Sequence, residues 1–317
     1  MVLLNIRYWL SNVVRILTIK DGCDSTPRQD SINAVPDQID TDPDVNQSSH
    51  ITRSSPQPVK AKNPASRSSI QHFPFPHDPY VNLPVLGMGM TGIIYELGED
   101  RVVKKARQSQ LSDAGNAEYM NTINQQTLEN ESQVFKRLGK CEGIIPCFQI
   151  SQYGIELARA QDDLESYMKT HPEPEIALKV KWILSLIKTF SHIHNCRIFV
   201  DDIALRNILI MDNQLKVADF GQSILLPPDA DITSATEGDL NARIEILHLG
   251  WILYSIISWQ VHKYYFFDEN PELRWPASFP VLDNILCGKL IENCWRGGYI
   301  SMDQLQHEAL QFLSGYY

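Results

Sequence analysis

The sequence predicts an α+β fold with two lobes, in which a small antiparallel β-sheet with one main helix precedes a mostly helical lobe. Short strand-like runs begin at about Tyr80, where Ile93–Leu97 and Arg101–Lys104 flank a tight acidic turn. A helical pattern, Leu128–Leu138, precedes another hairpin-like region that ends at about Ala160. Further helices are expected at about 174–194, 244–259, 284–294 and 301–314. We therefore expect lobes at residues 80–159 and 160–317.

Two different segments precede these lobes. Residues 21–79 are rich in proline and serine and hold few large apolar residues, which predicts a disordered linker because little surface can be buried to offset the ordering entropy. Residues 1–20 contain three basic residues, no acid, and apolar residues at three- and four-residue steps, which predicts an amphipathic helix. This helix could be a membrane-surface anchor, a mitochondrial presequence or a helix that packs on the folded body.

Composition narrows the functional class. The 317 residues carry a formal net charge of −10, which argues against a general nucleic-acid binder. The six cysteines are scattered without a C-x-x-C pair, which argues against a disulfide framework or a zinc ribbon and favours a reducing compartment. The apolar stretch Ile244–Trp259 is short for a bilayer span and predicts a buried helix. We expect a cytoplasmic or nuclear protein, with membrane-surface or mitochondrial targeting by residues 1–20 left open.

A glycine-rich loop gives the first functional signal. Gly87, Gly89 and Gly92 form a G-x-G-x-x-G pattern, whose glycines let the backbone approach a phosphate and expose its N–H donors. Such a loop can open the helix of a dinucleotide-binding fold or join two strands that fold over a nucleotide. The strand-like run Ile93–Leu97 follows here, so the sequence favours the second arrangement.

A lysine on the next strand fits this arrangement. The run Val102-Val103-Lys104 places Lys104 on this strand, with Val102 two residues earlier on the same face. The glycine hairpin followed by such a lysine resembles the protein-kinase arrangement, which implies that Lys104 holds the α- and β-phosphates and that Val102 covers the adenine. Ile94, on the strand after the glycine loop, is a further candidate for nucleotide contact. Lys105 is the alternative lysine, but it faces outward in this register.

The segment Ile198–Ile210 contains D-x-x-x-x-N, and Asp219-Phe220-Gly221 follows twelve residues after Asn207. Together with the glycine hairpin and V-x-K upstream, this order resembles the eukaryotic protein-kinase family over about residues 80–317. The resemblance implies ATP and Mg²⁺ as cofactors and a protein as the partner that is phosphorylated. It also implies that Asp202 orients the substrate hydroxyl, while Asn207 and Asp219 bind magnesium.

The resemblance assigns three more positions. Glu131 lies on the apolar face of the predicted helix Leu128–Leu138, where a carboxylate needs a partner, and it matches the family's partner of Lys104. The stretch Gly154–Ala160 resembles the hinge between the lobes, with Glu156 and Ala158 as nucleotide-binding candidates. Trp295, in a late segment of the second lobe, is expected to pack in the core.

The chain also departs from the family. Val200 and Asp201 replace the His and Arg before the catalytic Asp, and that Arg normally grips a phosphate on the activation loop. No A-P-E follows the D-F-G, although Glu237 could substitute for its Glu, and Glu245 stands where the family has Asp. We predict that phosphorylation of the activation loop is not the switch. The combination resembles divergent kinase-like proteins of filamentous fungi.

These observations favour an ATP-dependent protein kinase that modifies Ser or Thr rather than Tyr. Two alternatives remain open. A pseudokinase would keep the fold and bind nucleotide or partners without phosphotransfer, and a kinase-like enzyme would phosphorylate a small molecule. The complete nucleotide set favours catalysis, and the lack of an obvious inserted substrate cap weighs against a small-molecule kinase.

Overall fold

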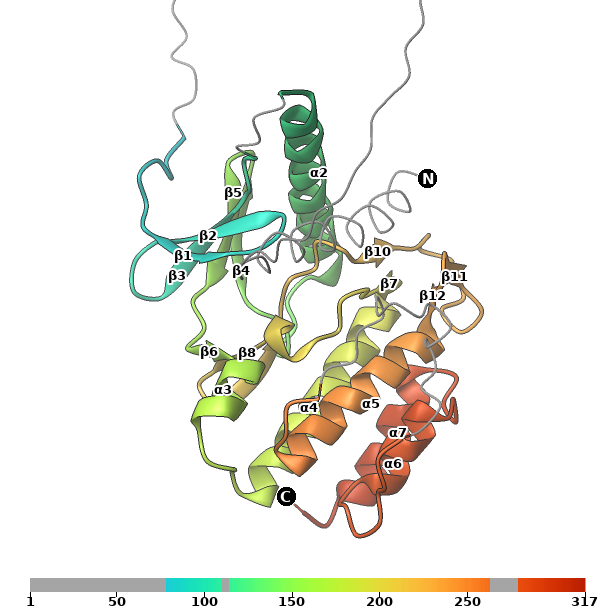
Figure 1. Cartoon of the computed structure of the whole chain (residues 1–317). Helices are drawn as coiled ribbons and strands as arrows, with labels where there is room; N and C mark the ends of the chain where they lie inside the picture. Colours follow the sequence, from blue (N-terminus) through green and yellow to red (C-terminus); the bar gives the residue numbers. More distant parts are fainter. Residues whose placement is uncertain (1–77, 110–113, 263–278, 317) are drawn as a thin grey trace, which may run out of the picture. The chain divides into compact units, whose positions relative to one another are not determined.

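The computed structural model of the chain describes residues 78–109, 114–262 and 279–316. The predicted amphipathic helix of residues 1–20, and the predicted linker except for Asp78 and Pro79, lie outside the described residues. The described elements form the expected α+β fold, in which an antiparallel sheet and one long helix precede a mostly helical lobe (Figure 1). Within these ranges no helix is both long enough and apolar enough to cross a membrane.

The sheet of the first lobe has five antiparallel strands in the order β1-β2-β3-β5-β4. The strands β1, β2 and β3 form a meander, in which Gly98, at a φ of 100°, lies in the turn between β2 and β3. Strand β5 pairs with β3 on one side and β4 on the other, and all five of its residues are buried. The strand bounds are β1 Val85–Met88, β2 Gly92–Glu96, β3 Arg101–Ala106, β4 Cys147–Ser151 and β5 Gly154–Ala158.

Helix α2, Ala114–Leu138, lies beside this sheet (Figure 1). The sequence predicted only its C-terminal part, from Leu128. The earlier turns escaped prediction because their buried face is partly polar and includes Asn124 and Thr127, so the apolar periodicity is weak there. The residues expected on one face of the helix, Leu128, Glu131, Val134, Phe135 and Leu138, are all buried.

Short paired strands flank the loops of the second lobe that contain Asp202 and Asp219. Strand β6, Asp162–Asp163, pairs with β8, Ile208–Met211, which pairs with β9, Gln214–Val217. Strand β7, Ile198–Phe199, pairs with β10, Ile224–Leu225. The 3₁₀ helix η1, Leu205–Asn207, leads into β8. The two lobes are joined by backbone bonds, since Val217 donates to the Gly143 carbonyl (2.8 Å) and accepts from the Ile145 N–H (3.0 Å).

Among the described residues, five further helices build the second lobe, and the apolar core continues from α4 into α5 and α6. Helix α5 is buried along most of its length, as the stretch Ile244–Trp259 predicted, and Trp295 is fully buried. Helix α6 begins at Gly288 rather than at residue 284, because Asn284 and Cys287 take left-handed backbone conformations (φ of 65° and 64°) that interrupt a helix. The helix bounds are α3 Leu164–Thr170, α4 Ile176–Asn195, α5 Ala242–Ser258, α6 Gly288–Trp295 and α7 Met302–Leu313.

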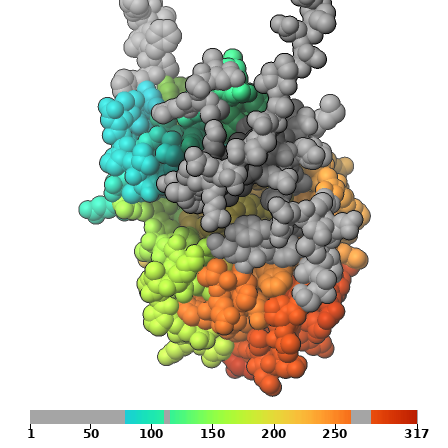
Figure 2. Space-filling model, in the orientation of Figure 1, coloured from blue at the N-terminus to red at the C-terminus, as the bar shows by residue number. Residues whose placement is uncertain are grey.

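The chain between Asp219 and α5 is short and folds back on the second lobe. It contains β10 and the hairpin of β11, Thr236–Glu237, with β12, Leu240–Asn241. Buried apolar side chains from this stretch, together with Ala242 at the start of α5, pack on Phe199 of β7: Ile224, Leu226 and Leu240. In Figure 2 the cyan atoms of the first strands lie at the upper side of the molecule and the orange and red atoms of the last helices lie at the lower side.

Candidate functional site

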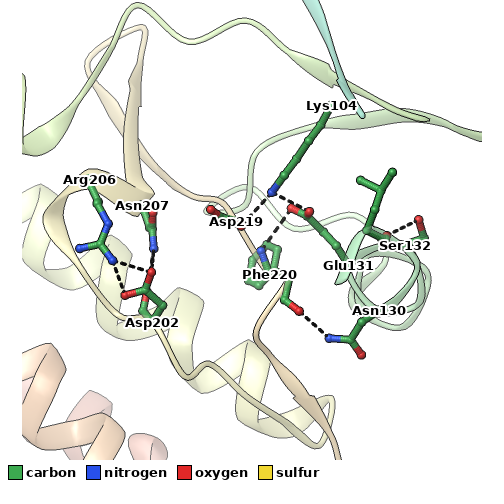
Figure 3. Close-up of polar contacts among 11 residues, drawn as sticks. Lys104, Asn130, Glu131, Ser132, Asp202, Arg206, Asn207, Asp219 and Phe220 are labelled. Atoms are coloured by element: carbon green, nitrogen blue, oxygen red, sulfur yellow. Dashed lines mark hydrogen bonds and ion pairs between the residues drawn. The ribbon is translucent and has the colours of Figure 1, made fainter. Parts of the chain in front are cut away.

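Lys104 of β3 lies between two carboxylates that come from different parts of the chain (Figure 3). Its Nζ lies 2.7 Å from Glu131 Oε2 on α2 and 2.8 Å from Asp219 Oδ1 after β9. The expected pairing of Lys104 with Glu131 is therefore confirmed. Lys105 faces away from this group and pairs instead with Asp78 at 2.6 Å, as alternation along a strand requires.

The electrostatics of this group favour a charged lysine. Burial alone lowers the pKa of Lys104, but the carboxylates of Glu131 and Asp219 outweigh burial and raise it. Lys104 also holds the pKa of Asp219 below its usual range. Burial raises the pKa of Glu131, and the ammonium of Lys104 opposes that rise. The side chain of Glu131 is fully buried, whereas that of Asp219 is 53% exposed, so Asp219 forms the solvent side of the group.

Helix α2 also holds the backbone next to Asp219. Glu131 Oε1 accepts a hydrogen bond from the Phe220 N–H (3.2 Å), and the Phe220 ring meets the Phe135 ring edge-on with centroids 5.4 Å apart. Asp219 itself has a φ of 59°, a left-handed conformation that a residue other than glycine adopts only when its surroundings hold it. The sequence Asp219-Phe220-Gly221 is thus fixed from the α2 side.

A second polar group forms around Asp202, in the loop after β7. The Arg206 Nη2 lies 2.7 Å and 2.6 Å from the two carboxylate oxygens of Asp202. The Asn207 Nδ2 donates to the Asp202 carbonyl and to its Oδ2, both at 2.9 Å (Figure 3). The Asn207 carbonyl then accepts from the Ala218 N–H (2.9 Å), which links this loop to the residue before Asp219.

The three glycines of the predicted phosphate loop lie in and around the connection between β1 and β2. Gly87 is in β1, Gly89 is between the strands, and Gly92 begins β2. The Gly89 N–H donates to the Gly92 carbonyl (2.8 Å), and Arg107 donates to the Gly89 carbonyl (3.2 Å), so the loop is closed on itself and tied to the end of β3. A Cβ at Gly92 would lie 3.0 Å from Cε of Lys104, so this glycine leaves room for the lysine.

The model of the protein kinase domain matches residues 80–240, just over half of the chain. The chain belongs to the protein kinase family. Comparison with curated proteins finds no match to it.

Strand register defines which side chains share the face of the sheet that carries Lys104. Ile94 pairs with Lys104, and Val102 pairs with Leu157, so these side chains share one face of the sheet. Lys104, Val102 and Leu157 are buried and Ile94 is partly buried against the same core. The sequence-predicted nucleotide residues Ile94 and Val102 are thus placed on the same side as Lys104.

Two residues that the sequence predicted to contact a nucleotide at the hinge, Glu156 and Ala158, are oriented differently from that prediction. Glu156 pairs with Val103, so its side chain lies on the opposite face of the sheet, where it accepts a 2.6 Å bond from the Tyr80 hydroxyl. Its carboxylate is therefore not directed to a nucleotide beside Lys104. The Ala158 N–H already donates to the Pro146 carbonyl (2.9 Å), so this N–H is not available as a donor to a ligand. Strand β5 is buried on both faces, so no polar–apolar alternation in the sequence revealed this orientation.

The donor set of the kinase site fits Mg²⁺ bound together with phosphates. Among the described residues, no group of three or more His, Cys, Asp or Glu side chains could hold a metal ion. Asn207 uses its amide nitrogen as a donor to Asp202, so its amide oxygen is the atom suited to a hard cation. That oxygen and the exposed carboxylate of Asp219 supply two hard ligands, and Mg²⁺ commonly completes its shell with phosphate oxygens and water.

Glu245, which stands where the family has Asp, connects two segments of the second lobe. Its Oε1 accepts from the Val200 N–H (2.6 Å), and its Oε2 lies 2.9 Å from Nε2 of His194 at the end of α4. This buried carboxylate therefore ties α5 to the loop that carries Asp202. Glu237 is exposed in β11, so it does not occupy the place of a buried ion-pair partner.

Sequence reasoning missed several side chains that shape the site. Asn130 and Arg137 of α2 donate to backbone carbonyls after Asp219, and such bonds leave no spacing pattern in a sequence. The Tyr80–Glu156 and Asp78–Lys105 contacts were also missed, since both join the predicted linker boundary to the sheet. The ion pair of Arg206 with Asp202 was detectable, because the two residues stand four positions apart.

Proposed function

We propose that this kinase domain transfers the γ-phosphoryl group of ATP, with Mg²⁺, to a Ser or Thr hydroxyl of a protein. The carrying observation is the placement of Lys104 between Glu131 and Asp219. Asp202 and Asn207 are bonded to one another in the neighbouring loop, and Asn207 is tied by its carbonyl to Ala218. Phosphoryl transfer depends mainly on positioning and charge neutralisation, and these five side chains supply both.

Each side chain has a separate role in this proposal. Lys104, kept charged by its two carboxylates, binds the α- and β-phosphates. Asp202 orients the substrate hydroxyl and accepts its proton. Asn207 and Asp219 hold the magnesium, which neutralises charge on the β- and γ-phosphates when it is bound. The glycine loop of Gly87, Gly89 and Gly92 lets the backbone between β1 and β2 approach the phosphates. Because the Gly89 N–H already donates to the Gly92 carbonyl, other N–H groups of the loop have to serve as the donors.

The adenine is proposed to lie on the face of the sheet shared by Ile94, Val102 and Leu157. The Ala158 carbonyl offers it an acceptor at the end of β5. Because the Ala158 N–H is already used, a donor from the hinge has to come from farther along the chain, after the end of β5. We place the activity in the cytoplasm or nucleus.

One observation favours a second candidate function, a pseudokinase that binds nucleotide without phosphotransfer. Arg206 engages both carboxylate oxygens of Asp202, and Asn207 engages one of them as well. A substrate hydroxyl has to compete with these donors for Asp202. The buried Lys104–Glu131 pair would serve nucleotide binding equally well in a protein of this kind.

The test measures transfer of labelled γ-phosphate from Mg-ATP to the protein itself and to a generic protein substrate. Replacing Asp202→Asn keeps the shape of the side chain but removes the base, so transfer is expected to fall about 100-fold or more. Phosphoamino-acid analysis of the product distinguishes Ser or Thr from Tyr. A folded wild-type protein whose transfer does not exceed that of Asp202→Asn would favour the pseudokinase.

A further inference from the structure

One amide on α2 holds the backbone just after the candidate magnesium ligand. The Asn130 Nδ2 donates to the Gly221 carbonyl at 3.0 Å and to the Ser223 carbonyl at 2.7 Å. Asn130 is partly buried and directed at this segment (Figure 3). A single side chain thus satisfies two carbonyls within four residues of Asp219.

Neighbouring residues of α2 make the contact continuous. Glu131 accepts from the Phe220 N–H, and a Cβ at Gly221 would lie 2.7 Å from Cγ2 of Thr127. Residues 127, 130 and 131 share one side of the helix because they are three and four positions apart. The segment Phe220–Ser223 therefore rests directly against α2, and glycine at 221 permits the close approach.

The same side of α2 holds the end of this stretch as well. Arg137, two turns after Asn130, donates to the Leu226 carbonyl at 2.6 Å, and the Leu226 N–H donates to the Arg197 carbonyl at 2.9 Å. Each acceptor in these bonds is a backbone carbonyl. These hydrogen bonds form without a phosphate, which agrees with the replacement of the usual phosphate-binding Arg by Asp201.

We propose that Asn130 is a positioning residue that fixes Asp219 for magnesium binding through the Gly221 and Ser223 carbonyls. Asp219 has a left-handed backbone, so its orientation depends on what holds the residues on either side. Ala218 is held by Asn207, and Phe220–Ser223 are held by α2. Partners that orient a metal ligand without touching the metal commonly change metal affinity by about 10- to 100-fold when they are removed.

The test compares variants of the full chain. Asn130→Asp keeps the size of the side chain but presents oxygens to two carbonyls, and Asn130→Leu removes the donor without adding charge. Asn130→Gln retains an amide and serves as the conservative variant. Gln133→Glu makes the same amide-to-carboxylate change on the exposed face of α2 and is the matched control.

Two readouts are used, and neither requires phosphotransfer. The first is the Mg²⁺ concentration that gives half-maximal binding of ATP, which is expected to rise about tenfold in Asn130→Asp and Asn130→Leu. The second is hydrogen exchange of the Phe220 and Ser223 amides, which is expected to accelerate in both. Asn130→Gln is expected to lie closer to the wild type, and Gln133→Glu to match it, while all variants stay folded.

The proposal is overturned if Asn130→Asp and Asn130→Leu keep the wild-type Mg²⁺ dependence, or if Gln133→Glu shifts it equally. It rests on the proposed function only in treating Asp219 as a magnesium ligand. A wild-type protein that binds Mg-ATP but transfers no phosphate would refute the catalytic proposal, and the same two readouts would still decide the role of Asn130.

Discussion

Lys104 depends on a glycine as much as on its two acidic partners. The lysine reaches Glu131 and Asp219 with its stem passing Gly92, whose hydrogen leaves space that a methyl group would fill. The glycine that the sequence assigned to phosphate contact thus has a second task in packing. The position of the Lys104 ammonium therefore depends on the space that Gly92 leaves for the methylene groups of the lysine.

Replacing Gly92→Ala is expected to raise the KM for ATP about tenfold, because the added Cβ has to displace the Lys104 stem by a few tenths of an ångström and misplaced groups lose affinity steeply. Steady-state kinetics at saturating Mg²⁺ measure it. Gly315→Ala, where nothing lies within 4 Å of the added Cβ, controls for the substitution itself. An unchanged KM would mean that Lys104 tolerates the shift.

The sequence predicted the residues that interact through charge better than those that interact through the backbone. The pair of Lys104 and Glu131 was predictable because a carboxylate on an apolar helix face needs a partner. The orientation of Glu156 was not, because a strand buried on both faces shows no alternation. Asn130 was not found either, because a carbonyl acceptor is present at every position of the chain.

At the scale of elements, α2 and the stretch after Asp219 form one unit. The sequence indicated only the second half of α2, since Asn124 and Thr127 replace apolar residues on its buried face. Those polar residues make contacts of their own, such as the bond from Asn124 to the Arg107 carbonyl (2.7 Å). The element order was readable from periodicity, but the first half of this helix was not, because its buried face is partly polar.

The triple replacement of Thr233, Ser234 and Thr236 by Ala is expected to leave phosphotransfer within about twofold of the wild type, because the stretch after Asp219 is held by α2 and by apolar packing rather than by a phosphate. Asp231 already accepts from the Thr233 and Ser234 hydroxyls, and a phosphate at either residue would meet its negative charge. Activity assays of both proteins, before and after phosphatase treatment, make the comparison. A tenfold loss in the triple variant would contradict it.

At the scale of the whole described molecule, a buried carboxylate joins three parts of the second lobe. Glu245 on α5 binds His194 at the end of α4 and the Val200 N–H before Asp202. Burial raises the pKa of Glu245, while His194 and the Val200 N–H oppose that rise. A folded-state pKa above the unfolded one means that the folded protein binds the proton more tightly.

The stability contributed by Glu245 is thus full below its unfolded pKa, near 4.5, and is lost as the pH rises through its raised folded pKa. Glu245→Gln cannot titrate, yet its amide can accept from Val200 and donate to His194. The free energy of unfolding of the wild type, relative to this variant, is expected to decrease with rising pH by at most about 1.4 kcal/mol per pH unit. Urea unfolding from pH 4 to 8 measures it, with the exposed Glu292→Gln as control. A relative stability that does not change with pH would contradict the assignment.

The complete burial of β5 also has a consequence for local opening. The amides of Ile155 and Leu157 lie in a fully buried strand that is paired on both sides, so their hydrogens are expected to exchange only when the whole domain unfolds. Lys104 is the register partner of Ile155 and shares this protection. Asp219 has an exposed side chain and lies outside the strands, so it is expected to become accessible by local opening before β5 does, although α2 and Asn207 hold the residues beside it. A nucleotide bound between Lys104 and Asp219 would therefore connect a strand that opens only on unfolding with a segment that is held mainly by side chains.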